Sequence, residues 1–418
     1  MTAPATHHQV VIIGGGSAGI AAASSLKARD RSLDIAIIDP ADVHYYQPGW
    51  TLVGGGVFTA KSTVRAMASV IPNDVQWIKA AVVTLRPETN TIVLDNAASI
   101  GYDQLIVCPG LKLDWAAIHG LTDTLGAHGV TSNYRYDLAP YTWQLVQNLK
   151  HGQALFTQPP MPIKCAGAPQ KALYLSCDYW LKNGRQSTIK TSFYTAGAVL
   201  FGVADYVPAL MQYMHKYAVD LKFTYTLVAV DGPKQQATFE CTLPDGTLDR
   251  VVESFDLLHV VPPQVAPDFI RNSPLADKAG WVDVDPGNLV HRRYANVHGL
   301  GDVINTTNAK TVAAARKQAP VVANNVLVAL GRNRDWAAYN GYGSCPLTVE
   351  RGKVVLAEFT YGGKVEPTFA PWLIDGRKPS RLAWILKKHV LPLLYWQGML
   401  KGREWLAGPS KVAAGQDK

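Results

Sequence analysis

Cysteine is scarce in this chain, with five residues among 418, and no two of them form a C-x-x-C pair. A disulfide scaffold, a zinc site and a thioredoxin-type dithiol are therefore not expected. The histidines show no metal-ligand spacing, so no metal is predicted. Charged residues make up only 17% and hydrophobic ones 48%, which excludes a disordered chain. The net charge of +8 favours anionic partners such as nucleotides and lipid headgroups, but no motif supports a nucleic-acid partner.

Long apolar runs are also absent. No segment approaches the roughly 18–20 apolar residues that span a bilayer. Met1–Gln9 contains neither an apolar secretory core nor an Arg-rich amphipathic stretch, so no signal or transit peptide is expected. The sequence therefore predicts a cytoplasmic protein that contacts a membrane from one side only.

The chain opens with a nucleotide-binding pattern. Gln9–Ile13 is a β-branched run typical of a buried strand, and it leads directly into the glycine turn Gly14–Gly19. Ile20–Ala28 favours a helix, and a second apolar run, Ile35–Ile38, ends at Asp39. This order of strand, G-x-G-x-x-G, helix, strand and acid matches the dinucleotide fingerprint, with the acid 20 residues after the last glycine.

The residues of this turn have separate expected roles. Gly14 permits the tight turn, Gly16 lets the backbone approach a pyrophosphate, and Gly19 lets the helix pack on the strand. The helix N-terminus offers free N–H groups to the phosphates. Asp39 can accept hydrogen bonds from the adenosine ribose.

Two later segments favour FAD over NAD. In flavoproteins that resemble disulfide reductases, the N-terminal βαβ unit binds FAD, and a late strand ending in Gly-Asp reaches the flavin. Tyr294–Asp302 fits that late strand, and a helix expected from Lys310-Thr311 aims its N-terminal dipole at the flavin. Leu105–Gly110 resembles the strand-to-glycine return that closes the first FAD segment. We expect non-covalent FAD, with Gly110 and Asp302 in its site.

A second nucleotide fingerprint is missing from the middle of the chain. Thr191–Thr195 is typical of a strand, but the segment that follows it, Ala196–Gly202, has two glycines and no G-x-G-x-x-G. No acid ends a strand about 20 residues later, as a nicotinamide site requires. We therefore expect a Rossmann-like unit without a phosphate turn, and electrons that do not come from a nicotinamide.

Two of the five cysteines lie in loops of small residues. Lys164 and Lys171 flank Cys165, just before a helix expected near Ala172–Leu181, and this setting should depress the pKa of the thiol. Cys345 lies in another glycine-rich loop. Ordinary packing is expected for the remaining three, which are Cys108, Cys177 and Cys241.

Several segments together resemble the sulfide:quinone oxidoreductase family, in the branch that includes the mitochondrial enzymes of animals. The two cysteine loops carry most of this resemblance, which covers nearly the whole chain. Its segments are Gly14–Gly19, His44–Pro48, Trp50–Gly54, Lys164–Lys171, Ala279–Asp285, His291–Tyr294, Gly301-Asp302, Tyr342–Leu347 and Leu356–Phe359.

The resemblance implies that Cys165 and Cys345 form a redox pair, bridged by a disulfide or a longer sulfur chain. Hydrogen sulfide attacks the bridge, Cys345 becomes a persulfide and Cys165 leaves as a thiolate beside FAD. A membrane quinone, ubiquinone or another, then takes the electrons, and a small thiol or sulfite accepts the sulfur. Cys177 has no implied role. The implied FAD contacts are Ser17, Ala18, Asp39, Gln47, Val82, Asp302, Lys310 and Thr311.

Two other functions stay open at this point. A type II NADH:quinone oxidoreductase shares the expected fold, the FAD and an amphipathic tail, but it gives the cysteines no role. A non-enzymatic flavoprotein that acts as a redox sensor or carrier would bind FAD without turnover.

The C-terminal region is rich in cations. Between Gly376 and Arg403 there is no acid, and the tryptophans Trp384 and Trp396 are interleaved with short apolar stretches. Such a pattern favours a monotopic anchor at the cytoplasmic face of the cell membrane. The seven cations are Arg377, Lys378, Arg381, Lys387, Lys388, Lys401 and Arg403.

The predicted fold is therefore α/β, with two Rossmann-like dinucleotide-binding domains and an amphipathic C-terminal membrane-binding region. A homo-oligomer is possible. The expected divisions are an FAD-binding domain in two parts (1–112 and 286–335), a middle domain (113–285), a C-terminal quinone- and membrane-binding region (336–409) and a disordered tail (410–418).

Overall fold

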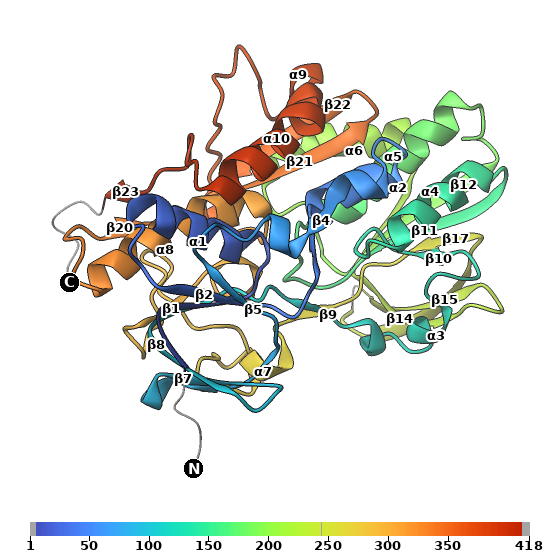
Figure 1. The fold of residues 1–418 in the computed structure, drawn as a ribbon. Coiled ribbons are helices and arrows are strands. Elements are labelled where there is room, and N and C mark those ends of the chain that lie inside the picture. The colour runs from blue at the N-terminus through green and yellow to red at the C-terminus, as the bar shows by residue number, and fades with distance from the viewer. Residues whose placement is uncertain (1–5, 244, 412–418) are drawn as a thin grey trace.

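The computed structural model describes residues 6–243 and 245–411. Two sheets of mainly parallel strands form its centre, and helices cover them (Figure 1). A helical C-terminal segment lies across the side that carries α1 and α8.

The first sheet has seven strands in the order β5-β2-β1-β8-β7-β6, with β19 also paired to β8. Strand β8 is long enough to pair with β7 near its start and with β19 near its end. The strands are β1 (Thr6–Ile13), β2 (Ile35–Ile38), β5 (Gln76–Ile78), β6 (Val82–Arg86), β7 (Thr91–Leu94), β8 (Ser99–Val107) and β19 (Val297–Gly299).

Helices α1 (Ser17–Arg29) and α8 (Val312–Ala329) pack side by side on this sheet. Strands β1, β2, β8 and β19 are parallel, so their carboxyl ends meet at one edge. Ligands of such sheets bind outside these ends. Each of these strands is followed by one of the predicted cofactor segments: Gly14–Gly19 after β1, Asp39 after β2, Gly110 after β8 and Gly301-Asp302 after β19. These segments therefore lie together at one edge of the sheet.

The middle sheet is entirely parallel, in the order β10-β17-β11-β12-β13, as expected for a Rossmann-like unit. A separate antiparallel sheet of three strands adjoins it. The strands are β10 (Val130–Thr131), β11 (Gly152–Gln158), β12 (Ile189–Thr195), β13 (Asp220–Phe223), β17 (Leu257–His259), then β14 (Tyr225–Asp231), β15 (Gln236–Thr242) and β16 (Leu248–Ser254). The helices of this part are α4 (Leu138–Asn148), α5 (Ala168–Lys182) and α6 (Val207–Lys216).

The chain crosses between the two parts at a short antiparallel pair, β9 (Lys112–Leu113) with β18 (Gln264–Val265). The first crossing coincides with the expected division at 112. The second crossing is at β18. After it, the chain already contributes to the hydrophobic core around the first sheet, through Ile270, Leu275 and Val282. The return therefore lies earlier than the expected 285, because residues 266–285 bury their apolar side chains against the FAD-binding part.

Cys345 does not lie in a loop, contrary to the prediction. It is a buried residue of β21 (Gly343–Glu350), which forms a hairpin with β22 (Lys353–Phe359). The glycines at 341 and 343 suggested a loop, but Gly343 pairs with Phe359 and opens the strand. This hairpin packs against α5, so the Cys345 thiol lies in the hydrophobic core that α5 shares with the middle sheet.

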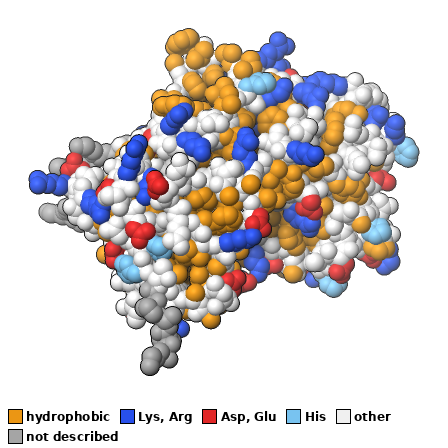
Figure 2. Space-filling model, in the orientation of Figure 1, with side chains coloured by type: hydrophobic (Ala, Val, Ile, Leu, Met, Phe, Trp, Pro, Cys, Tyr) orange, Lys and Arg blue, Asp and Glu red, His pale blue; other side chains and the backbone are white. Residues whose placement is uncertain are grey.

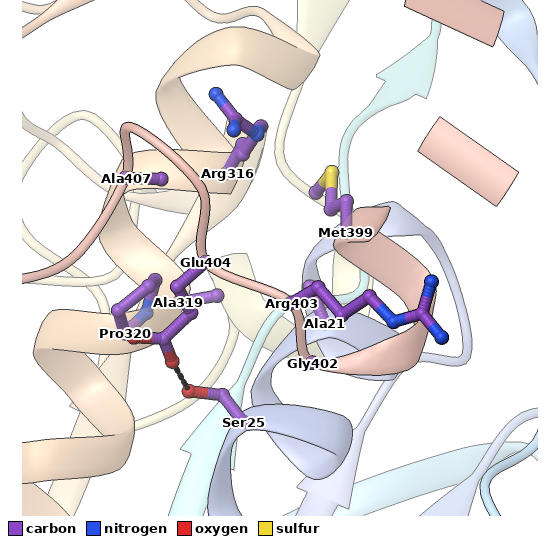
Figure 3. A pocket seen from close by; sticks show the side chains of 10 residues that line it. All are labelled: Ala21, Ser25, Arg316, Ala319, Pro320, Met399, Gly402, Arg403, Glu404 and Ala407. Atoms are coloured by element: carbon purple, nitrogen blue, oxygen red, sulfur yellow. Dashed lines mark hydrogen bonds between the residues drawn. The ribbon is translucent and has the colours of Figure 1, made fainter. Parts of the chain in front are cut away.

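The C-terminal segment runs through α9 (Arg381–Ile385) and α10 (Leu391–Leu393) as an almost continuous helix with two π-helical stretches. Its end packs on α1, where a Cβ at Gly402 would lie 2.5 Å from the Ser24 carbonyl oxygen. Figure 3 shows the small pocket left there, in which Ser25 of α1 donates to Glu404 at 2.5 Å. At about 10 Å³ this pocket has room for about one water molecule.

The predicted disordered tail begins with ordered backbone. Strand β23 (Ser410–Lys411) pairs antiparallel with β20 (Ala337–Ala338). The rest of that predicted tail, 412–418, lies outside the described residues.

In the part of the chain that the structure describes, no helix is long and apolar enough to cross a bilayer. Hydrophobic side chains are nevertheless exposed around α9 and α10, with Lys and Arg beside them (Figure 2). We call the following exposed residues the apolar patch: Trp372, Leu373, Leu382, Ile385, Leu393, Trp405 and Leu406.

Two of the expected anchor residues do not face the surface. Lys387 is 5% exposed and Trp396 is 7% exposed. Trp396 packs in the hydrophobic core around the first sheet, and the Arg65 guanidinium lies over its ring, 4.5 Å from the ring centre. The helical turn points these two side chains inward, which the sequence pattern of cations and tryptophans did not reveal.

Candidate active site

One cavity of about 370 Å³ collects residues from both sheets and the C-terminal segment. Nine predicted site residues line it: Gly16, Ser17, Ala18, Gln47, Gly110, Cys165, Asp302, Lys310 and Thr311. Five do not: Gly14, Gly19, Asp39, Val82 and Cys345.

The glycines of the turn between β1 and α1 have the geometry that their predicted roles require. Gly14 has φ +106°, and Gly19 has no room for a side chain because a Cβ there would lie 1.8 Å from the Gly14 carbonyl oxygen. At Gly16, in contrast, a Cβ would meet no atom within 4 Å, and the same holds for Gly110. Open space in front of two backbone segments and the free N-terminus of α1 suits a pyrophosphate.

Asp39 contacts this turn, and neither Asp39 nor Val82 lines the cavity. The Asp39 carboxylate accepts from the Gly15 N–H at 2.6 Å and from the Ala41 N–H at 2.8 Å. It therefore supports the turn, and because a carboxylate has about four acceptor positions, the ribose contact stays a prediction. Val82 is a buried residue at the start of β6, and its contact with FAD also stays a prediction.

The N-terminus of α8 also lines the cavity. Thr311 caps the helix, accepting from the Ala314 N–H at 3.2 Å, and Val312 begins it, as predicted to within two residues. The Lys310 ammonium instead turns into the Gly-Asp segment, where it donates to the carbonyls of Asp302 and Ile304 at 2.8 and 2.7 Å. Burial lowers the pKa of Lys310 to about 8 and raises that of Asp302.

The fold brings Cys165 and Cys345 together from positions 180 residues apart. Their Sγ atoms are 3.3 Å apart, and both residues are free cysteines. Cys165 has φ +51°, a left-handed conformation that costs a non-glycine residue roughly 1 kcal/mol or more and is common at functional sites. Its N–H donates to the Lys310 carbonyl at 2.8 Å, and the Tyr134 hydroxyl donates to the carbonyl of Lys164 at 2.9 Å, so neighbours on both sides hold this loop.

The two thiols differ strongly in acidity. The hydrogen bond from Cys345 and the cations of Lys171 and Lys387 hold the pKa of Cys165 well below its ordinary value, against the effect of burial. The same hydrogen bond, together with burial, raises the pKa of Cys345 well above its ordinary value. Lys171 donates directly to Cys165 Sγ at 3.0 Å. Cys165 is therefore the thiolate of the pair.

Lys387 lines the cavity, although the sequence pattern predicted it as an exposed cation of the membrane anchor. Its buried amino group donates to the Pro346 carbonyl at 2.8 Å and to the Thr348 hydroxyl. Burial and the charge of Lys171 lower the pKa of Lys387 well below its ordinary value, against the effect of the two thiols. The sequence identified it only as one cation of a basic segment. Only the tertiary fold places the C-terminal helix over the hairpin that carries Cys345.

Several buried polar atoms of the cavity have no partner within the described chain. They are Trp50 Nε1, Thr51 Oγ1 and both amide atoms of Asn133, and all three residues are at most 6% exposed. Buried polar groups are normally satisfied, so these atoms indicate a polar ligand. Together with the open turn at Gly16, they show that the residues present fit a dinucleotide with a polar ring system such as FAD.

The remaining three cysteines are buried, and one of them, Cys108, also lines the cavity. Cys108 follows β8, Cys177 lies in α5 and Cys241 in β15, and each is at most 4% exposed. Burial raises the pKa of Cys177 to about 12 and raises that of Cys108 as well. Among the described residues, no group of three His, Cys, Asp or Glu side chains is arranged to hold a metal ion.

Residues 8–158 match the family model described as pyridine nucleotide-disulphide oxidoreductase. The mitochondrial sulfide:quinone oxidoreductase of Dictyostelium discoideum is 41% identical over 94% of this chain and 86% of its own length. The mouse protein of the same name is 39% identical over 97% of this chain and 88% of its own length.

The solved structures support the same fold. The sulfide:quinone oxidoreductase of Aquifex aeolicus superposes with a TM-score of 0.79 at 19% identity, covering 96% of this chain and 92% of that one. The two relatives above are named mitochondrial proteins, so they do not support the predicted cytoplasmic face of the cell membrane. The names of these relatives also favour a sulfide:quinone oxidoreductase over a type II NADH:quinone oxidoreductase. The chain belongs to the sulfide:quinone oxidoreductase family, whose members are FAD-dependent enzymes with a quinone as electron acceptor.

Proposed function

We propose that this protein oxidises hydrogen sulfide at the Cys165–Cys345 pair and passes two electrons through FAD to a membrane quinone. The observation that carries the proposal is the asymmetric pair itself: two sulfurs 3.3 Å apart, one of them a thiolate beside Lys171 in the cavity wall. A thiolate and an electrophilic partner sulfur are what thiol–disulfide exchange requires.

The oxidised pair is bridged by sulfur. A direct S–S bond of about 2.05 Å requires the two Sγ atoms to approach each other, whereas two such bonds that meet at a roughly tetrahedral angle span about 3.3 Å. The observed 3.3 Å separates two free, hydrogen-bonded cysteines, and the proposed bridge is a disulfide or a longer sulfur chain. The strained loop of Cys165 is the part that would adjust between the two.

The first step is an exchange of S–S bonds. In the disulfide form, HS⁻ attacks Cys345 Sγ, the S–S bond to Cys165 breaks, and Cys345 carries the new S–S bond as a persulfide while Cys165 leaves as a thiolate. Ser344 and Pro346, on either side of Cys345 in β21, line the cavity, whereas Cys345 itself is buried, so HS⁻ has to reach its sulfur past the wall that Cys165 forms. Lys171 stabilises the leaving thiolate, and the amino group of Lys387, whose pKa burial lowers, interacts electrostatically with both sulfurs.

FAD bound in this cavity, which Cys165 lines, would supply a two-electron acceptor. The chain's own contribution is to hold that thiolate in place through the Lys310 backbone and to direct the N-terminus of α8 into the same cavity. A helix N-terminus stabilises negative charge, so this arrangement favours electron transfer toward the ring. A small thiol or sulfite then removes the sulfane sulfur from Cys345.

The quinone reaches the cavity from the apolar patch. Trp405 and Leu406 of the patch also line the cavity, so exposed apolar side chains border the site. Five of the expected cations remain exposed beside it: Arg377, Lys378, Arg381, Lys401 and Arg403. Apolar residues flanked by cations are typical of a segment that lies in the membrane surface.

Anaerobic titration of the holoenzyme tests this function. Sulfide should bleach the flavin absorption band, and a lipophilic quinone should restore it, whereas NADH should leave the band unchanged. Bleaching by NADH alone would instead identify a type II NADH:quinone oxidoreductase. No bleaching by either donor would indicate a flavoprotein without this activity.

A further inference from the structure

A buried chain of hydrogen bonds connects the C-terminal segment to the dinucleotide turn. His44 Nδ1 lies 3.0 Å from the Gly15 carbonyl oxygen, and His44 Nε2 lies 2.6 Å from the Tyr395 hydroxyl. The Tyr395 hydroxyl lies 2.7 Å from Ser17 Oγ. His44 and Tyr395 are 2% and 3% exposed, whereas Ser17 lines the cavity at the N-terminus of α1.

The Gly15 carbonyl sets the direction of this chain. A carbonyl oxygen can only accept, so His44 must carry its proton on Nδ1. In a neutral imidazole Nε2 is then an acceptor, and the Tyr395 hydroxyl must donate to it. The Tyr395 oxygen in turn accepts from Ser17, whose proton therefore points away from the cavity. The carbonyl of Tyr45, at 3.5 Å, is too distant to redirect the Tyr395 hydroxyl.

A diphosphate at the N-terminus of α1 demands the opposite direction. Its oxygens are acceptors, so Ser17 must donate to them rather than present a lone pair. Ser17 can donate outward only if it accepts from Tyr395, and Tyr395 then needs a donor at His44 Nε2. With Nδ1–H already committed to Gly15, both ring nitrogens must carry protons, which makes His44 an imidazolium.

We propose that FAD binding is coupled to the uptake of one proton by His44, and that Tyr395 is the positioning residue that transmits this proton's effect to Ser17. The C-terminal helix thereby becomes part of the cofactor site. This inference concerns cofactor retention and holds whether or not the proposed sulfur chemistry is correct.

The surroundings of His44 allow such a change of charge. Burial lowers its pKa, while the Gly15 carbonyl and the carboxylate of Asp39 raise it. The phenol of Tyr46 packs on the ring of Tyr395, and Arg65 lies opposite His44 in the β-ladder with its guanidinium over Trp396. Asp39 is thus the one anion near His44 among the described residues, and the FAD diphosphate would add a second.

Flavin release from the holoenzyme tests the coupling without any turnover. Holoenzyme is diluted at a series of pH values around the ordinary histidine range, and the Kd for FAD is read from flavin fluorescence. If one proton is taken up on binding, the Kd should rise with pH by up to about tenfold per unit above the His44 pKa of the free protein. Tyr395→Phe should weaken binding roughly three- to tenfold at low pH and flatten the dependence on pH. His44→Asn should flatten it in the same way.

A matched variant controls for the loss of a buried phenol. Tyr217→Phe removes a hydroxyl that donates to the Val349 carbonyl at 2.9 Å, away from the cavity, and should keep the wild-type slope. A wild-type Kd that does not change with pH would overturn the proposal by itself. Parallel profiles for wild type and Tyr395→Phe would also overturn it, because other groups near the flavin would then account for the slope.

Discussion

Cys165 and Cys345 carry the same thiol group in different surroundings. Cys165 lies in the cavity wall, 3.0 Å from a lysine ammonium, and Cys345 lies behind it in a buried strand. Replacing either with serine removes one sulfur of the bridge, so each change should abolish sulfide oxidation while FAD stays bound. The double variant should be no worse than either single one, because the two sulfurs act as one unit.

Steady-state sulfide oxidation and the flavin spectrum of each variant measure this. Cys177→Ser is the matched control, since Cys177 is a buried cysteine of α5 outside the cavity, and its activity should stay near that of the wild type. If Cys345→Ser kept most of its turnover, the persulfide role assigned to Cys345 would be wrong.

Lys171 should set the pH range in which Cys165 is a thiolate. Its cation helps to depress the pKa of Cys165, so Lys171→Met should raise that pKa. The Cys165 thiolate forms once HS⁻ has opened the bridge and is lost as the pH falls through its pKa, so the acid limb of the kcat profile should move to higher pH, by about one unit or more. Rates must be compared at equal HS⁻ concentration. An unmoved acid limb would show that Lys171 does not control this ionisation.

Gly167 leaves the space that Cys345 occupies. A Cβ at this position would lie 2.6 Å from Cys345 Sγ and 2.7 Å from a methyl carbon of Leu347. Gly167→Ala should therefore displace the hairpin, destabilise the protein by about 1–3 kcal/mol and reduce sulfide oxidation. Gly202→Ala is the control, because a Cβ there meets no atom within 4 Å. Thermal unfolding and turnover of the two variants should differ clearly.

At the scale of single elements, α8 supports the fold, and its first turn lines the cavity. Thr311 caps its N-terminus, and loss of such a cap costs about 1 kcal/mol. Thr311→Ala should lower the Tm and also weaken FAD binding, since the frayed first turn lines the cavity. Ser380→Ala removes the corresponding cap of α9, which accepts from the Ala383 N–H at 3.2 Å. That variant should affect stability without changing the affinity for FAD.

At the scale of the whole molecule, the C-terminal segment combines two roles that deletion cannot separate. It carries the apolar patch, but it also carries Lys387 beneath the cysteines and Tyr395 beside Ser17. Removing everything from residue 376 onward would open the active site as well as the proposed anchor. Point substitutions on the exposed face are therefore the sharper test of membrane binding.

The double variant Trp372→Ser with Leu393→Gln changes two residues that are 84% and 63% exposed and do not line the cavity. It should reduce flotation with anionic liposomes and slow flavin reoxidation by a lipophilic quinone, while flavin reduction by sulfide stays unchanged. Leu248→Gln is the control, because Leu248 is 72% exposed on the distant strand β16. Equal flotation of the two variants would require another quinone entrance.

The sequence by itself determined the local parts of this protein. The fingerprint from Gln9 to Asp39 predicted β1, α1 and β2, because strand and helix periodicity and glycine geometry are properties of neighbouring residues. The same reasoning placed Cys165 ahead of α5 and found no second fingerprint after β12.

Only the tertiary structure decided how distant segments meet. It joined two sulfurs 180 residues apart, placed Cys345 in a strand rather than a loop, and turned Lys387 and Trp396 inward from a segment predicted to face a membrane. It also brought Tyr395 to Ser17 across 378 residues of sequence. Such contacts depend on which faces of helices and hairpins pack against one another, and no local pattern in the chain records that choice.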